Sequence, residues 1–307
     1  MPTIVVLYEK GELGTIELKG HFRGIACDPK NDYATLVGDN GKVLRVFSDH
    51  TLRHLDSGTE THLRGISANP KDGRLLIAGN AGTLFTLSES VTKIEVPTFE
   101  NLRTVSWNAR GTTALIGGNS GVLLKYANSS VSSLGDGRAN LRRIAWHPHD
   151  NRALITSNCF AEQFLPSPNL FLYDSDKEQL RGVNESQADF VGVDWEPNGE
   201  SALVTGYDVV WHTGFIGQFI GTELRPLQFE NKQVYPVTVA WDPAGKHAAV
   251  CTAIAQPGMG TGSIRLWNGQ EFTMVFESGR YYFSAASWNH HGTLLALASP
   301  ANRAFNC

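Results

Sequence analysis

The chain has 307 residues, of which 41% are hydrophobic and 18% charged, and its formal net charge is -4. This length is sufficient for one large domain or two small ones. The acidic balance excludes a protein that is basic over its whole surface, so any binding of nucleic acid or phosphate would depend on a local patch. The sequence contains no run of roughly 18 consecutive apolar residues, and we therefore expect no membrane insertion.

A short sequence pattern recurs seven times along the chain. It consists of an apolar pair, a small residue, a bulky residue that we call the anchor, and then a turn. It is clearest at residues 102–108 and 141–148. Successive anchors are separated by 39 to 49 residues, which is typical of a repeat architecture. The anchor position is occupied by Cys27, Ala68, Trp107, Trp146, Trp195, Trp241 and Trp288.

Each repeat has the pattern of four short strands. The first strand ends at the anchor, and a turn rich in Pro, Asn, Asp and Gly follows, as in residues 242–245. The second strand is small and apolar, as in residues 114–118, and a hairpin supplies the third and fourth strands. No helical periodicity of useful length is present.

The two ends of the chain complete one repeat. The last repeat, from Phe283, has an anchor and a second strand but no further hairpin, whereas residues 4–18 form a hairpin without an anchor. We therefore predict an all-β protein, a seven-bladed β-propeller of four-stranded blades in which the N-terminal hairpin closes the last blade. We expect residues 1–307 to form a single domain, with blade 7 made of residues 283–307 and 1–18.

Over its whole length the chain resembles the WD40-type seven-bladed propellers. The resemblance is carried by the small-Trp-x-Pro-x-Gly turn at residues 240–245 and by aromatic residues late in the repeat, Tyr126, Tyr173 and Trp267. The family's Gly-His dipeptide is present only at residues 20–21, and its Trp-Asp dipeptide is replaced at best by Trp-Asn at residues 267–268. The photosystem-assembly propellers, which carry a repeated Gly-x-x-Gly strand turn, are a more distant resemblance.

An arginine stands four residues before the anchor in repeats 1 to 4 but not in repeats 5 to 7. In WD40-type relatives this residue opens the innermost strand and faces the mouth of the central channel. The resemblance therefore implies a rim of guanidinium groups that would attract a carboxylate or phosphate. Alternatively, each arginine pairs with an acid of a neighbouring blade, such as Asp194, Asp189, Glu60 or Glu100. The four rim arginines are Arg23, Arg64, Arg103 and Arg142.

Blades 4 to 6 are longer than blades 1 to 3 between the second and third strands. The extra residues lie in the ranges 157–169, 206–217 and 255–263. We expect long loops there, on the same face as the arginines, because binding residues often lie on loops of a rigid scaffold. The candidate binding residues in these loops are Tyr207, Trp211 and His212. The alternative is that these aromatic side chains pack over the blade edges.

Two groups of histidines, at residues 147–149 and 290–291, fall in the turns after the anchor, on the opposite face. Histidines this close can chelate a metal, but no carboxylate or cysteine is nearby in the sequence. We interpret them as exposed turn residues and predict no metal site and no cofactor. The sequence has no nucleophile elbow, P-loop or calcium-loop pattern, and we assign no catalytic residue.

These observations favour a non-enzymatic scaffold that binds an acidic protein, peptide or other anionic ligand at the channel mouth, as a monomer. One alternative is a propeller enzyme of the lyase or hydrolase type, with Tyr207, Asp208 and His212 around a small anionic substrate. Binding of nucleic acid or of an assembly factor is a further alternative that we do not favour. The chain starts without a basic leader and its four cysteines do not pair by spacing, so we expect a cytoplasmic protein.

Overall fold

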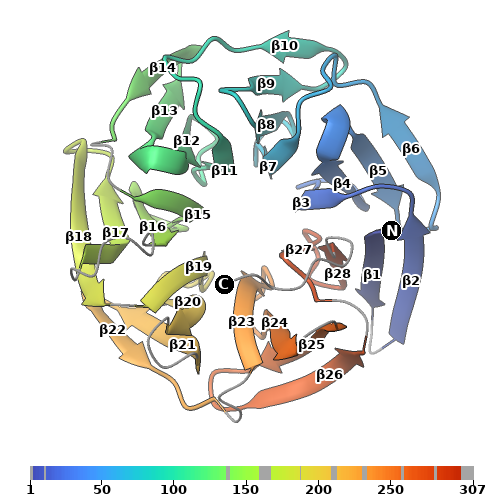
Figure 1. Cartoon of the computed structure of the whole chain (residues 1–307), viewed down its shortest axis with the longest axis vertical. Helices are drawn as coiled ribbons and strands as arrows, with labels where there is room; N and C mark the ends of the chain where they lie inside the picture. The colour runs from blue at the N-terminus through green and yellow to red at the C-terminus, as the bar shows by residue number, and fades with distance from the viewer. Residues whose placement is uncertain are drawn as a thin grey trace.

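The computed structural model describes residues 3–9, 12–135, 139–158, 167–186, 188–208, 213–229, 234–256, 259–279 and 282–298. These residues form seven antiparallel four-stranded sheets, arranged as blades around a central opening (Figure 1). The predicted all-β seven-bladed propeller is confirmed. The helical segments in this part of the chain are two single 3-10 turns, η1 (Asp39–Gly41) and η2 (Asn119–Gly121). Neither is long or apolar enough to cross a membrane.

The first three blades are continuous in the chain and run outward from the channel. Blade 1 consists of β3 (Phe22–Cys27), β4 (Tyr33–Gly38), β5 (Val43–Phe47) and β6 (Leu52–Leu55). Blade 2 consists of β7 (Leu63–Ala68), β8 (Leu75–Gly79), β9 (Leu84–Leu87) and β10 (Val91–Lys93). Blade 3 consists of β11 (Leu102–Trp107), β12 (Thr113–Gly118), β13 (Leu123–Ala127) and β14 (Ser130–Ser133).

The next three blades have the same order but longer strands. Blade 4 consists of β15 (Asn140–Trp146), β16 (Arg152–Asn158), β17 (Ser167–Asp174) and β18 (Gln179–Ser186). Blade 5 consists of β19 (Ala188–Trp195), β20 (Ser201–Asp208), β21 (Thr213–Ile220) and β22 (Glu223–Pro226). Blade 6 consists of β23 (Val234–Trp241), β24 (Ala248–Gln256), β25 (Met259–Trp267) and β26 (Phe272–Ser278).

Blade 7 is assembled from the two ends of the sequence. The strands β27 (Ala285–Trp288) and β28 (Leu294–Ala298) are joined by β1 (Thr3–Glu9) and β2 (Glu12–Leu18), in the order β2-β1-β28-β27. In this register Leu7 lies opposite Ala296. The N-terminal hairpin therefore closes the ring, as predicted. Residues 299–307, which we also expected in this blade, lie outside the described part of the chain.

The hydrophobic core is divided into seven clusters of described residues, one at each contact between neighbouring blades. In β8, Leu75 and Ile77 pack against blade 1, whereas Leu76 packs against blade 3. Both faces of each sheet are thus covered, and β8 has no polar side chain at any position instead of an alternating pattern. Successive strand residues face opposite sides of the sheet, so one strand serves two clusters.

Anchor tryptophans join neighbouring blades by hydrogen bonds as well as by packing. The indole Nε1 of Trp146 donates to the carbonyl oxygen of Ser106 in the preceding blade, at 2.9 Å. Trp195 and Trp288 make the equivalent bonds, to Ala145 at 3.2 Å and to Ala240 at 3.0 Å. These bonds satisfy buried polar groups between sheets that share no backbone ladder.

Two other anchor tryptophans bond the preceding blade through the backbone N–H instead of the indole. The N–H of Trp107 donates to Ser67 Oγ at 3.2 Å, and the N–H of Trp241 donates to Asp194 Oδ2 at 2.7 Å. Within the described residues, the indole nitrogens of both tryptophans are buried and have no hydrogen-bond partner. The anchor tryptophans thus bond the preceding blade in two ways, through the indole to a backbone carbonyl or through the backbone N–H to a side chain.

The extra residues of blades 5 and 6 lengthen strands, which differs from the long loops that we expected. In blade 5 the hairpin of β20 and β21 continues until Asp208 lies opposite Thr213. In blade 6 the hairpin of β24 and β25 continues until Gln256 lies opposite Met259. Strand pairing satisfies backbone N–H and C=O groups that a loop would have to satisfy in other ways. Residues 159–166 of blade 4 lie outside the described residues.

We expect Trp146→Phe to lower the free energy of unfolding by about 1–2 kcal/mol more than Trp107→Phe. Both indoles are buried, and each packs edge-on against a tyrosine of its own blade, Tyr173 or Tyr126. Only Trp146 loses a hydrogen bond between blades when the nitrogen is removed. Urea unfolding of the two variants measures the difference, and equal losses would contradict a stabilising role for the indole bond.

Candidate functional site at the channel mouth

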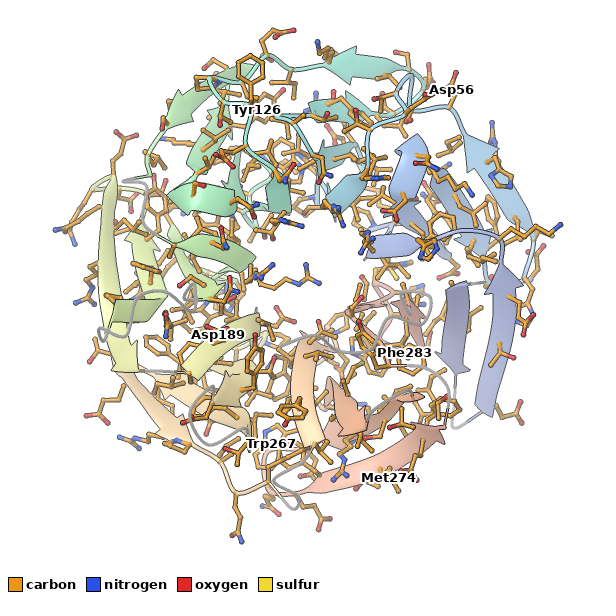
Figure 2. All side chains as sticks on the ribbon, viewed as in Figure 1. Asp56, Tyr126, Asp189, Trp267, Met274 and Phe283 are labelled. Atoms are coloured by element: carbon orange, nitrogen blue, oxygen red, sulfur yellow. The ribbon has the colours of Figure 1, made fainter. Side chains whose placement is uncertain are left out.

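The rim arginines occupy a β-bulge at the start of each inner strand. In blade 3 the pairing of β11 with β12 shifts between Leu102 and Thr104, so Arg103 is the extra residue. The same shift occurs in blades 1, 2 and 4, at Arg23, Arg64 and Arg142. A bulge redirects the side chain of the extra residue. Side chains with nitrogen ends gather along the inner edge of these four blades (Figure 2).

In three blades the arginine is held by an asparagine sixteen positions later in the same blade. The bond runs from the arginine Nε to the amide oxygen, from Arg64 to Asn80 at 2.9 Å, from Arg103 to Asn119 at 2.9 Å, and from Arg142 to Asn158 at 2.8 Å. Each asparagine stands at or directly after the end of the second strand. The Nε partners are therefore residues of the same blade and not the neighbouring acids that we considered.

In blade 1 an aspartate takes the place of the asparagine. Arg23 forms a bidentate ion pair with Asp39, with Nε–Oδ1 at 2.7 Å and Nη2–Oδ2 at 3.0 Å. Burial opposes ionisation of Asp39, but the hydrogen bonds and charge of Arg23 outweigh it and lower the pKa of this carboxyl, helped by His62 and Arg64. The charge of Arg23 is thus compensated within its own blade.

The positive charge is least compensated at Arg103 of blade 3, whereas the carboxylate of Asp189 partly compensates Arg142 of blade 4. An amide oxygen carries no net charge, and within the described residues neither Arg103 nor Arg142 forms an ion pair with a carboxylate. Burial lowers the pKa of Arg103, and the nearby charges of Arg142 and Arg23 lower it further. Burial also lowers the pKa of Arg142, while Tyr207 and Asp189 raise it.

Blade 5 brings an acid and a tyrosine to the same rim. Tyr207 Oη donates to Oδ2 of the buried Asp189 at 2.9 Å, across the β19–β20 pair. The ring of Tyr207 packs edge-on against Tyr235 at 6.3 Å between centroids. The candidate residues Trp211 and His212 lie outside the described residues. The enzyme alternative depends on His212 and therefore stays a prediction.

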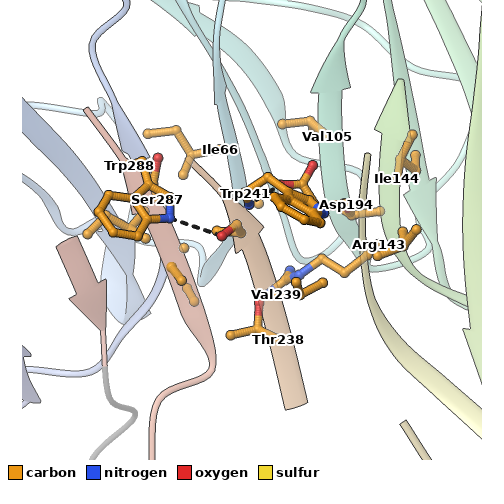
Figure 3. Close-up of a pocket in the computed structure, with 18 of the residues that line it drawn as sticks. Ile66, Val105, Arg143, Ile144, Asp194, Thr238, Val239, Trp241, Ser287 and Trp288 are labelled. Atoms are coloured by element: carbon orange, nitrogen blue, oxygen red, sulfur yellow. Dashed lines mark hydrogen bonds between the residues drawn. The ribbon is translucent and has the colours of Figure 1, made fainter. Parts of the chain in front are cut away.

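Below the rim, a cavity of about 280 Å³ lies between the inner strands of all seven blades (Figure 3). Arg143 of blade 4 extends across it, and its Nη2 donates to the carbonyl oxygen of Ser284 in blade 7 at 2.7 Å. Our sequence analysis did not select Arg143. A signal was available, because most other blades have Gly or Thr at this position, as at Gly24 and Thr238.

A half-buried carboxylate lies in the wall of the same cavity. Asp194 accepts a hydrogen bond from the backbone N–H of Trp195 at 3.0 Å and one from Trp241 at 2.7 Å. Burial raises the pKa of Asp194 to about 7, although both hydrogen bonds act to lower it. The side chain therefore changes its protonation state near neutral pH, inside the channel.

We expect the stability of the wild type to fall more steeply between pH 4 and pH 7 than that of Asp194→Asn. An unfolded aspartate ionises near pH 4, so between about pH 4 and pH 7 the folded chain holds a proton that the unfolded chain has lost. This difference destabilises the folded state as the pH rises, by up to about 4 kcal/mol. Thermal melts across this range measure it, with the exposed Glu95→Gln as control. Parallel curves for the wild type and Asp194→Asn would contradict the expectation.

Comparison with known proteins supports the fold. No protein-family model and no curated protein matches the chain. Among solved structures, the hydrazine synthase of Kuenenia stuttgartiensis is similar, with a TM-score of 0.72 and 13% sequence identity over 94% of this chain and 95% of that chain. At this identity the similarity shows a common fold and does not extend to the chemistry that the name of that enzyme describes. The chain is thus a seven-bladed β-propeller, and its WD40 membership stays a prediction.

Proposed function

We propose that the chain is a non-enzymatic scaffold that binds an acidic segment of a protein partner at the channel mouth. The observation that best supports this is the bonding of Arg103 and Arg142 to neutral amides, Asn119 and Asn158. A guanidinium that is held through Nε keeps its two terminal NH2 groups for another partner. That pair of groups matches the two oxygens of a carboxylate.

An asparagine positions the guanidinium without compensating its charge. In blade 1 the position of the asparagine is occupied by Asp39, which bonds both Nε and Nη2 of Arg23. There the carboxylate compensates the charge of the arginine. Holding a long side chain in advance reduces the conformational entropy that is lost on binding. Partial burial also strengthens the attraction to an anion, because the local dielectric constant is lower than in water.

The part of the rim next to Arg142 favours an acidic peptide over a nucleic acid. Asp189 and Tyr207 of blade 5 lie there, and the whole chain has a net charge of -4. A continuous polyanion would be repelled by these carboxylates, since its charges cannot avoid them. A peptide can place its acidic groups at Arg103 and Arg142 and present polar or aromatic groups to Tyr207.

We expect the double variant Arg103→Ala/Arg142→Ala to lose the stabilisation by anions that the wild type shows. A ligand at a hundredfold excess over its Kd stabilises the folded state by about 2.7 kcal/mol. Thermal melts with inorganic phosphate and with a short polyglutamate peptide measure this gain. The expected gain is present in the wild type and absent in the double variant.

The matched control is Arg152→Ala, which removes an arginine from the turn region on the opposite face. This variant should keep the full gain. If the double variant gains as much stability from phosphate and polyglutamate as the wild type does, the rim is not the binding site.

We expect Asp39→Asn to increase the affinity of the rim for anions severalfold. The substitution gives blade 1 the same neutral partner that blades 2 to 4 have, and it releases the charge of Arg23. Isothermal titration with polyglutamate at low salt compares the two proteins. A lower affinity in Asp39→Asn would show that the aspartate positions the rim rather than limiting its charge.

A further inference from the structure

Three side chains that can bind a metal meet on the face opposite the rim. Asp32 lies in the turn between β3 and β4 of blade 1, and His290 and His291 lie in the turn between β27 and β28 of blade 7. One potential ligand atom from each of the three residues lies within 4.8 Å of the others. Asp32 and His291 are exposed, and His290 is half-buried. Our sequence analysis excluded a metal here because no carboxylate is near the histidines in the sequence; the fold supplies one.

A buried asparagine holds the carboxylate in place. Asn289 Nδ2 donates to Asp32 Oδ1 at 3.3 Å, while Asn289 Oδ1 accepts the backbone N–H groups of Thr293 at 2.9 Å and Leu294 at 3.0 Å. Residues that hydrogen-bond a ligating carboxylate orient it and are a regular part of metal sites. Asp32 is therefore fixed to the turn that carries the two histidines.

The two imidazoles lie against each other, with ring centroids 3.7 Å apart. Two imidazoles on one tetrahedral metal have centroids about 5 Å apart, so the exposed ring of His291 has to rotate outward to bind. The Nδ1 atom of His290 is shielded from solvent and has no hydrogen-bond partner among the described residues. Leaving such a nitrogen unsatisfied is unfavourable, and a neutral imidazole is the form that binds a metal.

The histidines in the corresponding turn of blade 4 are arranged differently: His147 stands at the position of Asn289, and His149 at that of His291. His147 Nε2 bonds the carbonyl oxygen of Gly199 at 3.0 Å, and its Nδ1 accepts backbone N–H groups of His149 and Asp150. Both ring nitrogens of His147 are thus used within the protein. This contrast distinguishes the blade 7 histidines from an ordinary turn histidine of the same face.

We propose that Asp32, His290 and His291 form a binding site for a divalent transition metal, for which Zn²⁺ is the best match. Two imidazole nitrogens and one carboxylate oxygen are a common zinc ligand set, and water supplies the fourth position. Tetrahedral zinc with these ligands requires its ligand atoms to be about 3.3 Å apart. The exposed side chain of His291 can reach that distance by rotation, while Asn289 holds Asp32. Mg²⁺ and Ca²⁺ prefer sets made of oxygen ligands alone and fit poorly.

Such a metal would connect the two ends of the ring. His290 and His291 belong to the turn before β28, and Asp32 belongs to blade 1, which follows the N-terminal hairpin. The pairing of β1 with β28 joins the same two parts of the chain by backbone hydrogen bonds. Metal binding would add to this closure, and the stability of the folded state would rise with the logarithm of the metal concentration above the Kd.

The test measures Zn²⁺ binding to the full chain after removal of metal, in a Cys159→Ser/Cys307→Ser background that excludes the two thiols outside the described residues. Isothermal titration should give one equivalent of Zn²⁺, and thermal melts should show a higher Tm with Zn²⁺. Replacement of Zn²⁺ by Co²⁺ should give the visible absorption of a tetrahedral site. Asp32→Asn, which keeps the side-chain shape, and His291→Ala should each raise the Kd about tenfold or more.

The matched control is His149→Ala, an exposed histidine in the equivalent turn of blade 4, which should bind Zn²⁺ like the parent. Circular dichroism confirms that each variant is folded. The proposal is overturned if the parent binds no Zn²⁺, if Asp32→Asn and His291→Ala bind it unchanged, or if His149→Ala reduces binding as much as they do. An equal rise in Tm with Mg²⁺ would overturn the assignment to a transition metal.

Discussion

Each of the seven sheets must be covered on both faces by its neighbours, and the rest of this structure depends on that requirement. Leu75 and Ile77 of β8 face one neighbouring blade and Leu76 faces the other. The space between blades is therefore filled by apolar side chains. The candidate anion rim and the candidate metal site both lie where the packing ends.

The architecture could be predicted because packing imposes a period on the sequence. The recurrent anchor gave the number of blades, and the incomplete last repeat indicated that the N-terminal hairpin closes the ring. The arginines could also be recognised, because they recur at one position of the repeat. Their orientation could not be derived from alternation, since it depends on a β-bulge at Arg103 and its equivalents.

Contacts between distant residues were harder to predict. The sixteen-residue spacing from Arg103 to Asn119 is present in the sequence, but its meaning appears only once the strand register is known. Asp32 and Asn289 are 257 positions apart, and only the closure of the ring brings them together. In blades 5 and 6, strand pairing extends to Asp208 and Gln256, so the length that we read as loops continues the hairpins.

The two kinds of anchor bond have a consequence for how such a ring can evolve. Asp194 accepts the backbone N–H of Trp241, whereas Ala145 offers only its carbonyl oxygen, which the indole of Trp195 uses. The bond between a blade and its successor thus differs from one interface to the next. A blade copied to another place in the ring would meet an anchor with a different requirement and leave a buried donor or acceptor unsatisfied. The repeats are similar in sequence, but the hydrogen bonds between neighbouring blades favour one order of the blades in the ring.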